Sequence, residues 1–244
     1  MSVVSVPFHL DEHLAGFEPP LRPDLVVAPE LPSGGPWDRM AVLYEQVAAA
    51  VAMERRAGRV PIVVSGDCTT SLGVVAGLQR SGIDPALVWF DAHGDVQTPQ
   101  TSTSGYLGGM PIRQLVGGAD RTVPDALGLR PVAEADVVLV DGRDLDPPEA
   151  EFLAGSAIRQ VGADAIPAPD RPCYLHLDVD VCDPSELPGL LFPVPGGVPL
   201  AQLGSAVAGV LASGNVVAIG LACTYRPGSG AAPALAGFAA AHLA

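Results

Sequence analysis

The sequence ALVWFDAHGD, residues 86–95, changes from an apolar run to side chains that can bind a metal ion. The run ALVWF has the β-branched and aromatic composition that is typical of a buried strand. Asp91, His93 and Asp95 follow at alternate positions. Alternate side chains of an extended chain point the same way, about 6.5–7 Å apart. We therefore expect a strand that ends with three ligand-type side chains facing one point.

Apolar runs of the same kind recur along the chain, and each ends at a polar motif. They are PIVVS before Gly66, DVVLV before Asp141, CYLHLDV around Asp178 and NVVAIGLA before Cys223. The first 40 residues are rich in Pro and Gly, which predicts surface loops around one short strand near residues 2–7. Ala- and Leu-rich stretches elsewhere predict helices at residues 37–56, 71–80, 108–117, 199–213 and 230–243.

Strands that alternate with helices predict a parallel sheet covered on both faces. The sequence contains no internal repeat and no linker that would separate two domains. We therefore predict an α/β fold, a single three-layer domain over residues 1–244 with a mostly parallel β-sheet flanked by helices.

A second acidic motif, LHLDVDVCDP at residues 175–184, repeats the pattern of the first. Asp178 and Asp180 stand at alternate positions, as Asp91, His93 and Asp95 do in the first motif. Both motifs follow apolar strands, and the ligand sites of parallel sheets lie beyond the carboxyl ends of the strands. Either motif alone could be an acidic turn. Together they gather four carboxylates in a mostly apolar protein, at a large desolvation cost. Two divalent cations about 3.5–4 Å apart would offset that cost and activate a shared water molecule.

The two motifs resemble those of the ureohydrolase family, which includes arginase, agmatinase and formiminoglutamase. DAHGD and DVDVCDP occur in the family's order, and four other segments match in place: SGDCTTS (65–71), TPQTSTSGYLGGMP (98–111), VDGRDLDPPE (140–149) and PVPGGV (193–198). The resemblance implies an arginase-like fold and a hydrolase with two divalent metal ions, Mn by family. A metal-bridging hydroxide would cleave a non-peptide C–N bond of a linear amidine, which is a guanidino, N-hydroxyguanidino, ureido or formimino compound.

The resemblance also assigns roles to residues of this chain. One metal ion would be bound by Cys68, Asp91, Asp95 and Asp178, and the other by Asp91, His93, Asp178 and Asp180. Asp95 would also be the catalytic residue that accepts a hydrogen bond from the hydroxide and passes a proton to the leaving nitrogen. The substrate would be bound by Gln97, Ser104, Asp146 and Thr224. His176 would either face the metal layer or be a core histidine bonded to backbone.

Four positions depart from the family pattern. Cys68 replaces the first metal-ligand His, and a soft thiolate favours Fe, Co, Ni or Zn over Mn. Thr224 replaces the Glu that pairs with a guanidinium group, and Gly108 replaces a His of the substrate loop, where Tyr106 replaces an Asn. These exchanges favour a substrate group less basic than guanidinium.

Composition restricts the partners. A net charge of −14, with Arg as the only strongly basic residue, argues against a nucleic-acid partner. The four cysteines lack CxxC spacing, the N-terminus lacks a basic n-region, and no apolar run reaches about 18 residues. We therefore expect a cytoplasmic protein that binds a small molecule and no membrane. The resemblance adds the expectation of a homo-oligomer, a trimer or a hexamer.

Two other functions stay open at this point. Cys68 could be the nucleophile of a cysteine hydrolase, although the base would have to be His93 or His176, which have better uses. The chain could also be a catalytically weak metal- or ligand-binding relative with a regulatory role, because two positions that handle substrate are altered.

Overall fold

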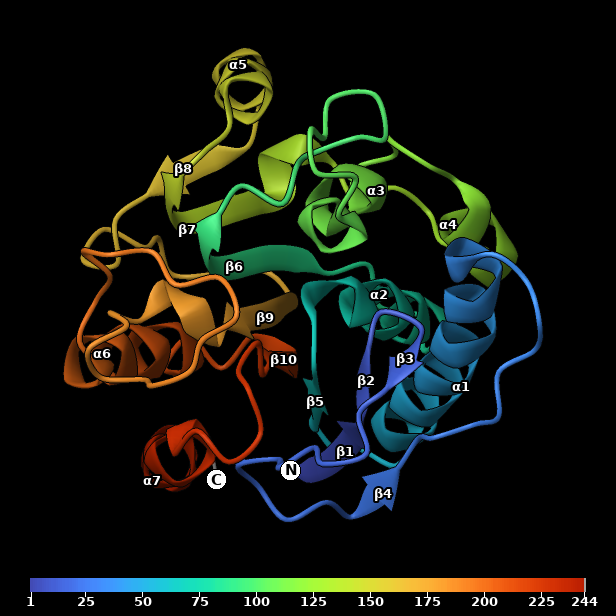
Figure 1. The fold of residues 1–244 in the computed structure, drawn as a ribbon, viewed down its shortest axis with the longest axis horizontal. Coiled ribbons are helices and arrows are strands. Elements are labelled where there is room, and N and C mark those ends of the chain that lie inside the picture. Colours follow the sequence, from blue (N-terminus) through green and yellow to red (C-terminus); the bar gives the residue numbers. More distant parts are fainter. Residues whose placement is uncertain (244) are drawn as a thin grey trace.

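The computed structural model describes residues 1–243. An eight-stranded sheet runs through the protein in the order β4-β1-β5-β10-β9-β6-β7-β8, and every strand pair in it is parallel (Figure 1). The strands are β1 (Ser2–Val6), β4 (Leu25–Val26), β5 (Pro61–Ser65), β6 (Ala86–His93), β7 (Val137–Asp144), β8 (Arg159–Val161), β9 (Cys173–Asp178) and β10 (Val216–Ala222). The predicted α/β class with a mostly parallel sheet is confirmed.

Helices cover both faces of this sheet. Along β6, Leu87 and Trp89 pack into the apolar cluster beneath the first group of helices, whereas Val88 and Phe90 pack into the cluster on the opposite face. The first group consists of α1 (Pro36–Arg56), α2 (Ser71–Arg80), α3 (Pro111–Leu115) and α4 (Thr122–Leu127), and the opposite face carries α6 (Leu200–Leu211) and α7 (Ala231–His242). Helix α5 (Pro147–Gly155) follows β7 at the edge of the sheet (Figure 1). Among residues 1–243, no helix is long and apolar enough to cross a membrane.

The predicted helix at 108–117 is wrong in its extent. A 3-10 turn at Leu107–Gly109 comes first, and α3 begins only at Pro111, which occupies the first helical turn. Proline lacks the N–H group that would continue the preceding turn, so a new helix starts there. The prediction also omitted α4, α5, β8 and β4, together with a small hairpin of β2 (Phe8–His9) and β3 (Glu12–His13) near the N-terminus.

The sheet order brings the polar motifs together. Strands β5, β10, β9 and β6 are neighbours in the middle of the sheet, and they run in the same direction. Cys68 follows β5, Asp91 and Asp178 lie at the ends of β6 and β9, and Thr224 follows β10. Segments more than 150 residues apart in the chain therefore contribute side chains to one point at the carboxyl edge of the sheet.

Candidate metal centre

Cys68 lies at the start of the 3-10 turn Cys68–Thr70, which connects β5 to α2. The side chain of Asp67 caps this turn by accepting a hydrogen bond from Thr69 N (2.8 Å). The turn directs the buried thiol toward the ends of the neighbouring strands, where Cys68 Sγ lies 2.8 Å from Asp178 Oδ2 and 3.8 Å from Asp91 Oδ2. Burial raises the pKa of the Cys68 thiol, and the nearby carboxylate of Asp178 adds to the effect.

Asp91 and His93 end β6 at an irregularity in its pairing with β7. Asp91 is 1% exposed, and it accepts hydrogen bonds from His93 N (2.8 Å) and from Trp89 Nε1 (3.2 Å). His93 Nδ1 lies 3.4 Å from Asp91 Oδ1 and 3.2 Å from Asp180 Oδ2. Burial alone would lower the pKa of His93, but its bonds to Asp180 and Asp91 raise it to about 12. The imidazole is therefore the one cation among these acids.

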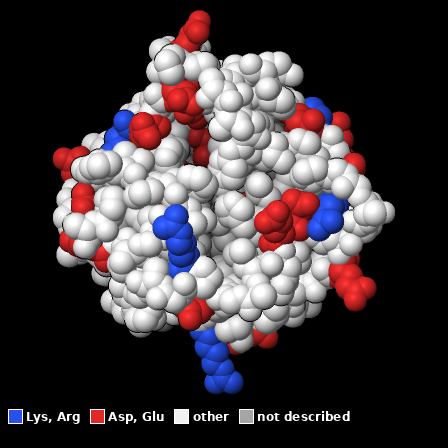
Figure 2. Space-filling model, viewed as in Figure 1, with Lys and Arg blue, Asp and Glu red and all other residues white. Residues whose placement is uncertain are grey.

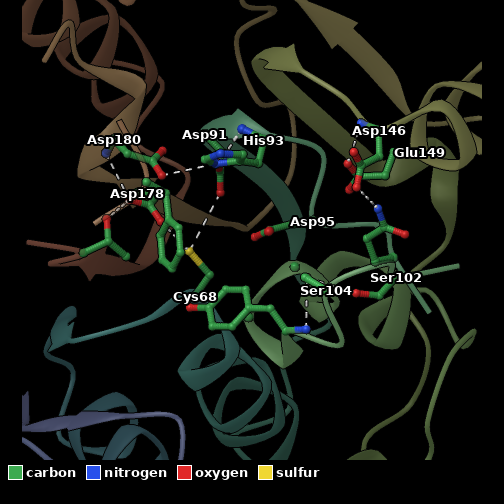
Figure 3. A pocket seen from close by; sticks show the side chains of 16 residues that line it. Cys68, Asp91, His93, Asp95, Ser102, Ser104, Asp146, Glu149, Asp178 and Asp180 are labelled. Atoms are coloured by element: carbon green, nitrogen blue, oxygen red, sulfur yellow. Dashed lines mark hydrogen bonds and ion pairs between the residues drawn. The ribbon is translucent and has the colours of Figure 1, made fainter. Parts of the chain in front are cut away.

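Asp95 follows in the loop after β6 with φ of +55°, a left-handed conformation that Asp tolerates better than most residues. Its side chain is 4% exposed, and Oδ2 has no hydrogen-bond partner. Burial raises the pKa of Asp95 well above its ordinary value, and the charges of Asp91 and Asp178 raise it further. Figure 3 shows Asp95 between Cys68 and Asp91 on one side and Asp146 and Glu149 on the other.

Asp178 and Asp180 come from the end of β9 and the 3-10 turn that follows it. Asp178 Oδ1 caps this turn by accepting from Asp180 N (3.0 Å), and it also accepts from Thr224 Oγ1 (2.6 Å). Asp180 Oδ1 accepts from Ala92 N (3.2 Å), which ties the turn to β6. Burial raises the pKa of both carboxyl groups, and the charge of Asp91 raises both further; the charge of Asp180 also raises the pKa of Asp178.

The donor set fits divalent metal ions. Asp91, Asp95, Asp178 and Asp180 are each at most 4% exposed, and one imidazole offsets only part of their negative charge. The ligand atoms form two groups, and within each group the atoms lie within 4.8 Å of one another. One group is Cys68, Asp91 and His176, and the other is Asp91, His93 and Asp180. The unpartnered Oδ2 of Asp95 is a further free acceptor. Oxygen, nitrogen and sulfur ligands of this kind are those that transition metals take in proteins.

A pocket opens above these residues, and the loop after β6 forms one side of it. Gln97 Nε2 donates to Asp146 Oδ2 (2.9 Å), and Gln97 Oε1 accepts from Thr101 Oγ1 (2.7 Å). Ser102 and Ser104 line the outer part, with their hydroxyl oxygens 3.4 Å apart. The predicted substrate residues Gln97, Ser104, Asp146 and Thr224 all line this pocket, together with the six predicted metal ligands Cys68, Asp91, His93, Asp95, Asp178 and Asp180.

An aromatic wall closes another side of the pocket. We use this term for Tyr106 and Phe192, whose ring centroids are 5.0 Å apart, and His9, which stacks on Tyr106 at 5.8 Å. The Tyr106 hydroxyl lies 3.1 Å from His9 Nε2, while His9 Nδ1 lies 2.9 Å from the carbonyl oxygen of Gly66. A Cβ atom added at Gly108 would lie 2.3 Å from two carbons of the Tyr106 ring. Tyr106 therefore occupies the space that a side chain at position 108 would need.

Comparison with known proteins identifies the family. The model of the arginase family matches residues 22–235, which is most of the chain. The chain belongs to the arginase family. It is 32% identical over 197 residues to the hepatic arginase of Aquarana catesbeiana and 33% identical over 175 residues to arginase-1 of Homo sapiens. The matched regions cover 70% and 63% of this chain, but only 61% and 54% of those relatives.

Solved structures agree with this assignment at the level of the fold. The arginase of Bacillus cereus superposes with a TM-score of 0.84 at 22% identity, covering 98% of this chain and 96% of that one. A formimidoylglutamase of Bacillus subtilis superposes with a TM-score of 0.72 at 14% identity, covering 99% and 85%. The family membership and arginase-like fold that the sequence predicted are confirmed.

Some residues of this arginase-family pocket were missed in the sequence. Glu149 lines it and is 5% exposed, and its buried carboxylate accepts hydrogen bonds from Val96 N (3.3 Å) and from Asp146 N (3.1 Å). The spacing of Asp146 and Glu149 is that of a helix capping box, which is the sequence signal for the start of α5. Phe192 carried no such signal, and neither did His9, which lies outside every predicted motif and is partly buried against Tyr106.

Proposed function

We propose that this arginase-family chain is a dinuclear-metal hydrolase that cleaves a non-peptide C–N bond of a linear amidine. The observation that carries the proposal is the gathering of four buried carboxylates, a thiol and an imidazole at the floor of one pocket. Such a cluster has too few positive charges of its own. The family match and its similarity to arginases support the same reading.

The predicted ligand assignment is compatible with the distances between these side chains. The carboxylates of Asp91 and Asp178 both lie next to Cys68 Sγ, so both could be ligands shared by two ions. Cys68 and Asp95 would complete the ligand set of one ion, and His93 and Asp180 would complete that of the other. When bound, two divalent cations lower the pKa of a water molecule so that hydroxide is available at neutral pH.

The remaining groups of the pocket would bind the substrate and move a proton. Asp95 Oδ2 has no protein partner and faces the pocket, so it can hold a proton and donate it to the leaving nitrogen. Gln97, Ser104 and Asp146 offer amide, hydroxyl and carboxylate groups to the far end of a substrate that carries charged or polar ends. On the face of the protein shown in Figure 2, the basic side chains are few and lie apart from one another. Such a surface suits a small-molecule substrate better than a polyanion, which needs clustered positive charge.

The pocket favours a group less basic than guanidinium. Thr224 donates its hydroxyl to Asp178 and brings no carboxylate of its own. A guanidinium ion would lose the charge-assisted hydrogen bonds that a carboxylate there would accept. The aromatic wall adds apolar surface on the side of Gly108. We infer that an N-hydroxyguanidine, ureido or formimino compound is preferred over plain arginine or agmatine.

The test is a steady-state comparison of kcat/KM for arginine, agmatine, N-hydroxyarginine, formiminoglutamate and a ureido amino acid, after reconstitution with Mn²⁺, Co²⁺, Fe²⁺ or Zn²⁺. We expect turnover of at least one less basic compound, lowered on the order of 100-fold or more by Asp95→Asn at saturating metal. Arginine as the best substrate by a wide margin would contradict the substrate inference. Retained metal without turnover of any compound would favour a ligand-binding role.

A further inference from the structure

His176 lies inside the candidate metal centre, although no part of the proposed function uses it. It stands one strand step before Asp178 on β9 and is 1% exposed. One ligand atom each of His176, Cys68 and Asp91 lie within 4.8 Å of one another. The imidazole therefore belongs to the set of ligand atoms that includes the thiol, whereas His93 and Asp180 form the other set with Asp91.

Three neighbours hold the ring in place. Its face stacks on Trp89 with a centroid distance of 3.7 Å and an interplanar angle of 28°. Nδ1 lies 3.0 Å from Ser71 Oγ and 3.2 Å from the Tyr174 hydroxyl. On the next strand, a Cβ atom at Gly220 would lie 1.9 Å from the Tyr174 hydroxyl and 3.0 Å from Nδ1, so glycine leaves the space that both groups need. The ring thus has a fixed orientation before any ligand binds.

The other ring nitrogen has no partner. Nε2 of His176 is buried and makes no hydrogen bond with any described residue. A buried polar atom without a partner costs free energy unless a water molecule or an ion satisfies it. If Nδ1 donates its proton to Ser71 or Tyr174, Nε2 carries the lone pair, which is the form that binds a metal ion.

We propose that His176 Nε2 is a ligand of the metal ion beside Cys68, which makes the two metal positions chemically unlike. This inference rests on the proposed dinuclear function and refines it. The position at Cys68 has sulfur, nitrogen and carboxylate donors, a set that suits Zn²⁺, Co²⁺ or Fe²⁺. The position at His93 and Asp180 has one imidazole with carboxylates, a set that suits Mn²⁺.

The same donors explain how a thiol that faces acids becomes a ligand. Cys68 Sγ now donates to Asp178 Oδ2 (2.8 Å). When the ion binds, the metal–sulfur bond replaces the S–H bond, and the proton leaves to solvent. No oxidation accompanies this exchange. Since the neutral imidazole adds no negative charge, it completes the donor set without increasing repulsion among the carboxylates.

The direct test is ¹⁵N-histidine NMR of the full chain, metal-free and after loading with Zn²⁺, which is diamagnetic. The chain has only five histidines, so each imidazole can be assigned by substitution. We expect the ring nitrogens of both His93 and His176 to move to metal-bound shifts, with Nε2 the affected atom of His176. A shift of His93 alone would overturn the role of His176 and leave the dinuclear site standing. Failure to take up Zn²⁺, Co²⁺ or Mn²⁺ would overturn the proposed function as well.

Variants give a second readout that does not depend on turnover. The His176→Asn protein keeps a polar group near Ser71 and loses Nε2, whereas Tyr174→Phe, the matched control, removes one hydroxyl near Nδ1 and keeps Nε2. Titrated with Co²⁺, the wild type should show a sulfur-to-cobalt charge-transfer band, which Cys68→Ser abolishes. Tyr174→Phe leaves Ser71 as the partner of Nδ1, so it should weaken the cobalt binding that this band reports by about 10-fold at most, whereas His176→Asn, which removes the ligand atom, should weaken it clearly more. Equal weakening by the two variants would mean that the ring only packs.

Loading with a mixture of metals tests the unlike positions themselves. After addition of one equivalent of Zn²⁺ per chain, then of excess Mn²⁺, and removal of the excess, mass spectrometry of the elements should find about one ion of each per chain in the wild type, and Cys68→Ser, which removes the sulfur donor, should retain less zinc. Undiminished retention of zinc in Cys68→Ser would contradict the assignment of different donor sets.

Discussion

The packing of Tyr106 over Gly108 predicts how the pocket responds to a single added methyl group. In Gly108→Ala, Cβ would start 2.3 Å from the Tyr106 ring. The ring must move by about 1.2 Å to restore an ordinary carbon contact of about 3.5 Å. That movement breaks the hydrogen bond of 3.1 Å to His9 Nε2 and loosens the aromatic pair with Phe192. Each loss costs about 0.5–1.5 kcal/mol, so we expect destabilisation by about 1–3 kcal/mol.

The assay is urea unfolding in a double-mutant cycle with Tyr106→Ala. Without the ring, Gly108→Ala should cost less than about 0.5 kcal/mol, which leaves a coupling energy of about 0.5–3 kcal/mol. Gly109→Ala is the matched control from the same turn, because its Cβ would meet only Gln97 Cγ at 3.7 Å. An equal cost of Gly108→Ala with and without Tyr106, or a cost no larger than that of Gly109→Ala, would refute the reasoning.

Three further predictions concern stability, acid sensitivity and specificity. In Gly77→Ala, Cβ would lie 2.7 Å from the carbonyl oxygen of Ala48, so calorimetry should show a lower Tm despite a helix-propensity gain of about 1 kcal/mol; a higher Tm would contradict the close packing of α1 and α2. The guanidinium of Arg59 lowers the pKa of Glu54 to about 2. The contribution of the Glu54 carboxylate to the free energy of unfolding is therefore present above the ordinary carboxyl pKa and is lost as pH falls toward 2. Because Arg59 is 48% exposed, Glu54→Gln should cost only about 1 kcal/mol at pH 7 and nothing near pH 2, in urea unfolding at both pH values; a constant difference would contradict the ion pair. Thr224→Glu should raise the ratio of kcat/KM for arginine to that for N-hydroxyarginine roughly 10-fold at equal metal content. An unchanged ratio would mean that Thr224 does not determine the substrate preference.

Much of the fold was predictable because its signals are local. Apolar runs such as those that end at Asp91 and Asp178 became buried central strands, and the long Ala-rich stretch at 37–56 became α1. The elements that were missed are short or depend on tertiary contacts. Strand β8 has only three residues, none of them buried, and it exists because it pairs with β7 at the edge of the sheet.

The candidate site was predictable only as a set of residues. Alternation along a strand and the family resemblance indicated which side chains gather, and the structure brings them to one pocket. Sequence could not give the free Nε2 of His176, because the orientation of the ring depends on bonds from Nδ1 to Ser71, which is distant in the chain, and to Tyr174 of the same strand. The replacement of His by Gly at position 108 could likewise be explained only from the structure, in which Tyr106 fills the space next to Gly108. The trimer or hexamer and the cytoplasmic location stay predictions.

The central claim, a site for two metal ions at the end of the sheet, is tested most directly by elemental mass spectrometry of the reconstituted protein. We predict about two divalent ions per chain in the wild type and clearly fewer in Asp180→Ala. Asp144→Ala is the matched control: its carboxylate lies 3.9 Å from His93 but is 63% exposed, so this variant should keep both ions. A wild-type protein that takes up no Mn, Fe, Co, Ni or Zn, or an Asp180→Ala protein with undiminished metal, would contradict the account.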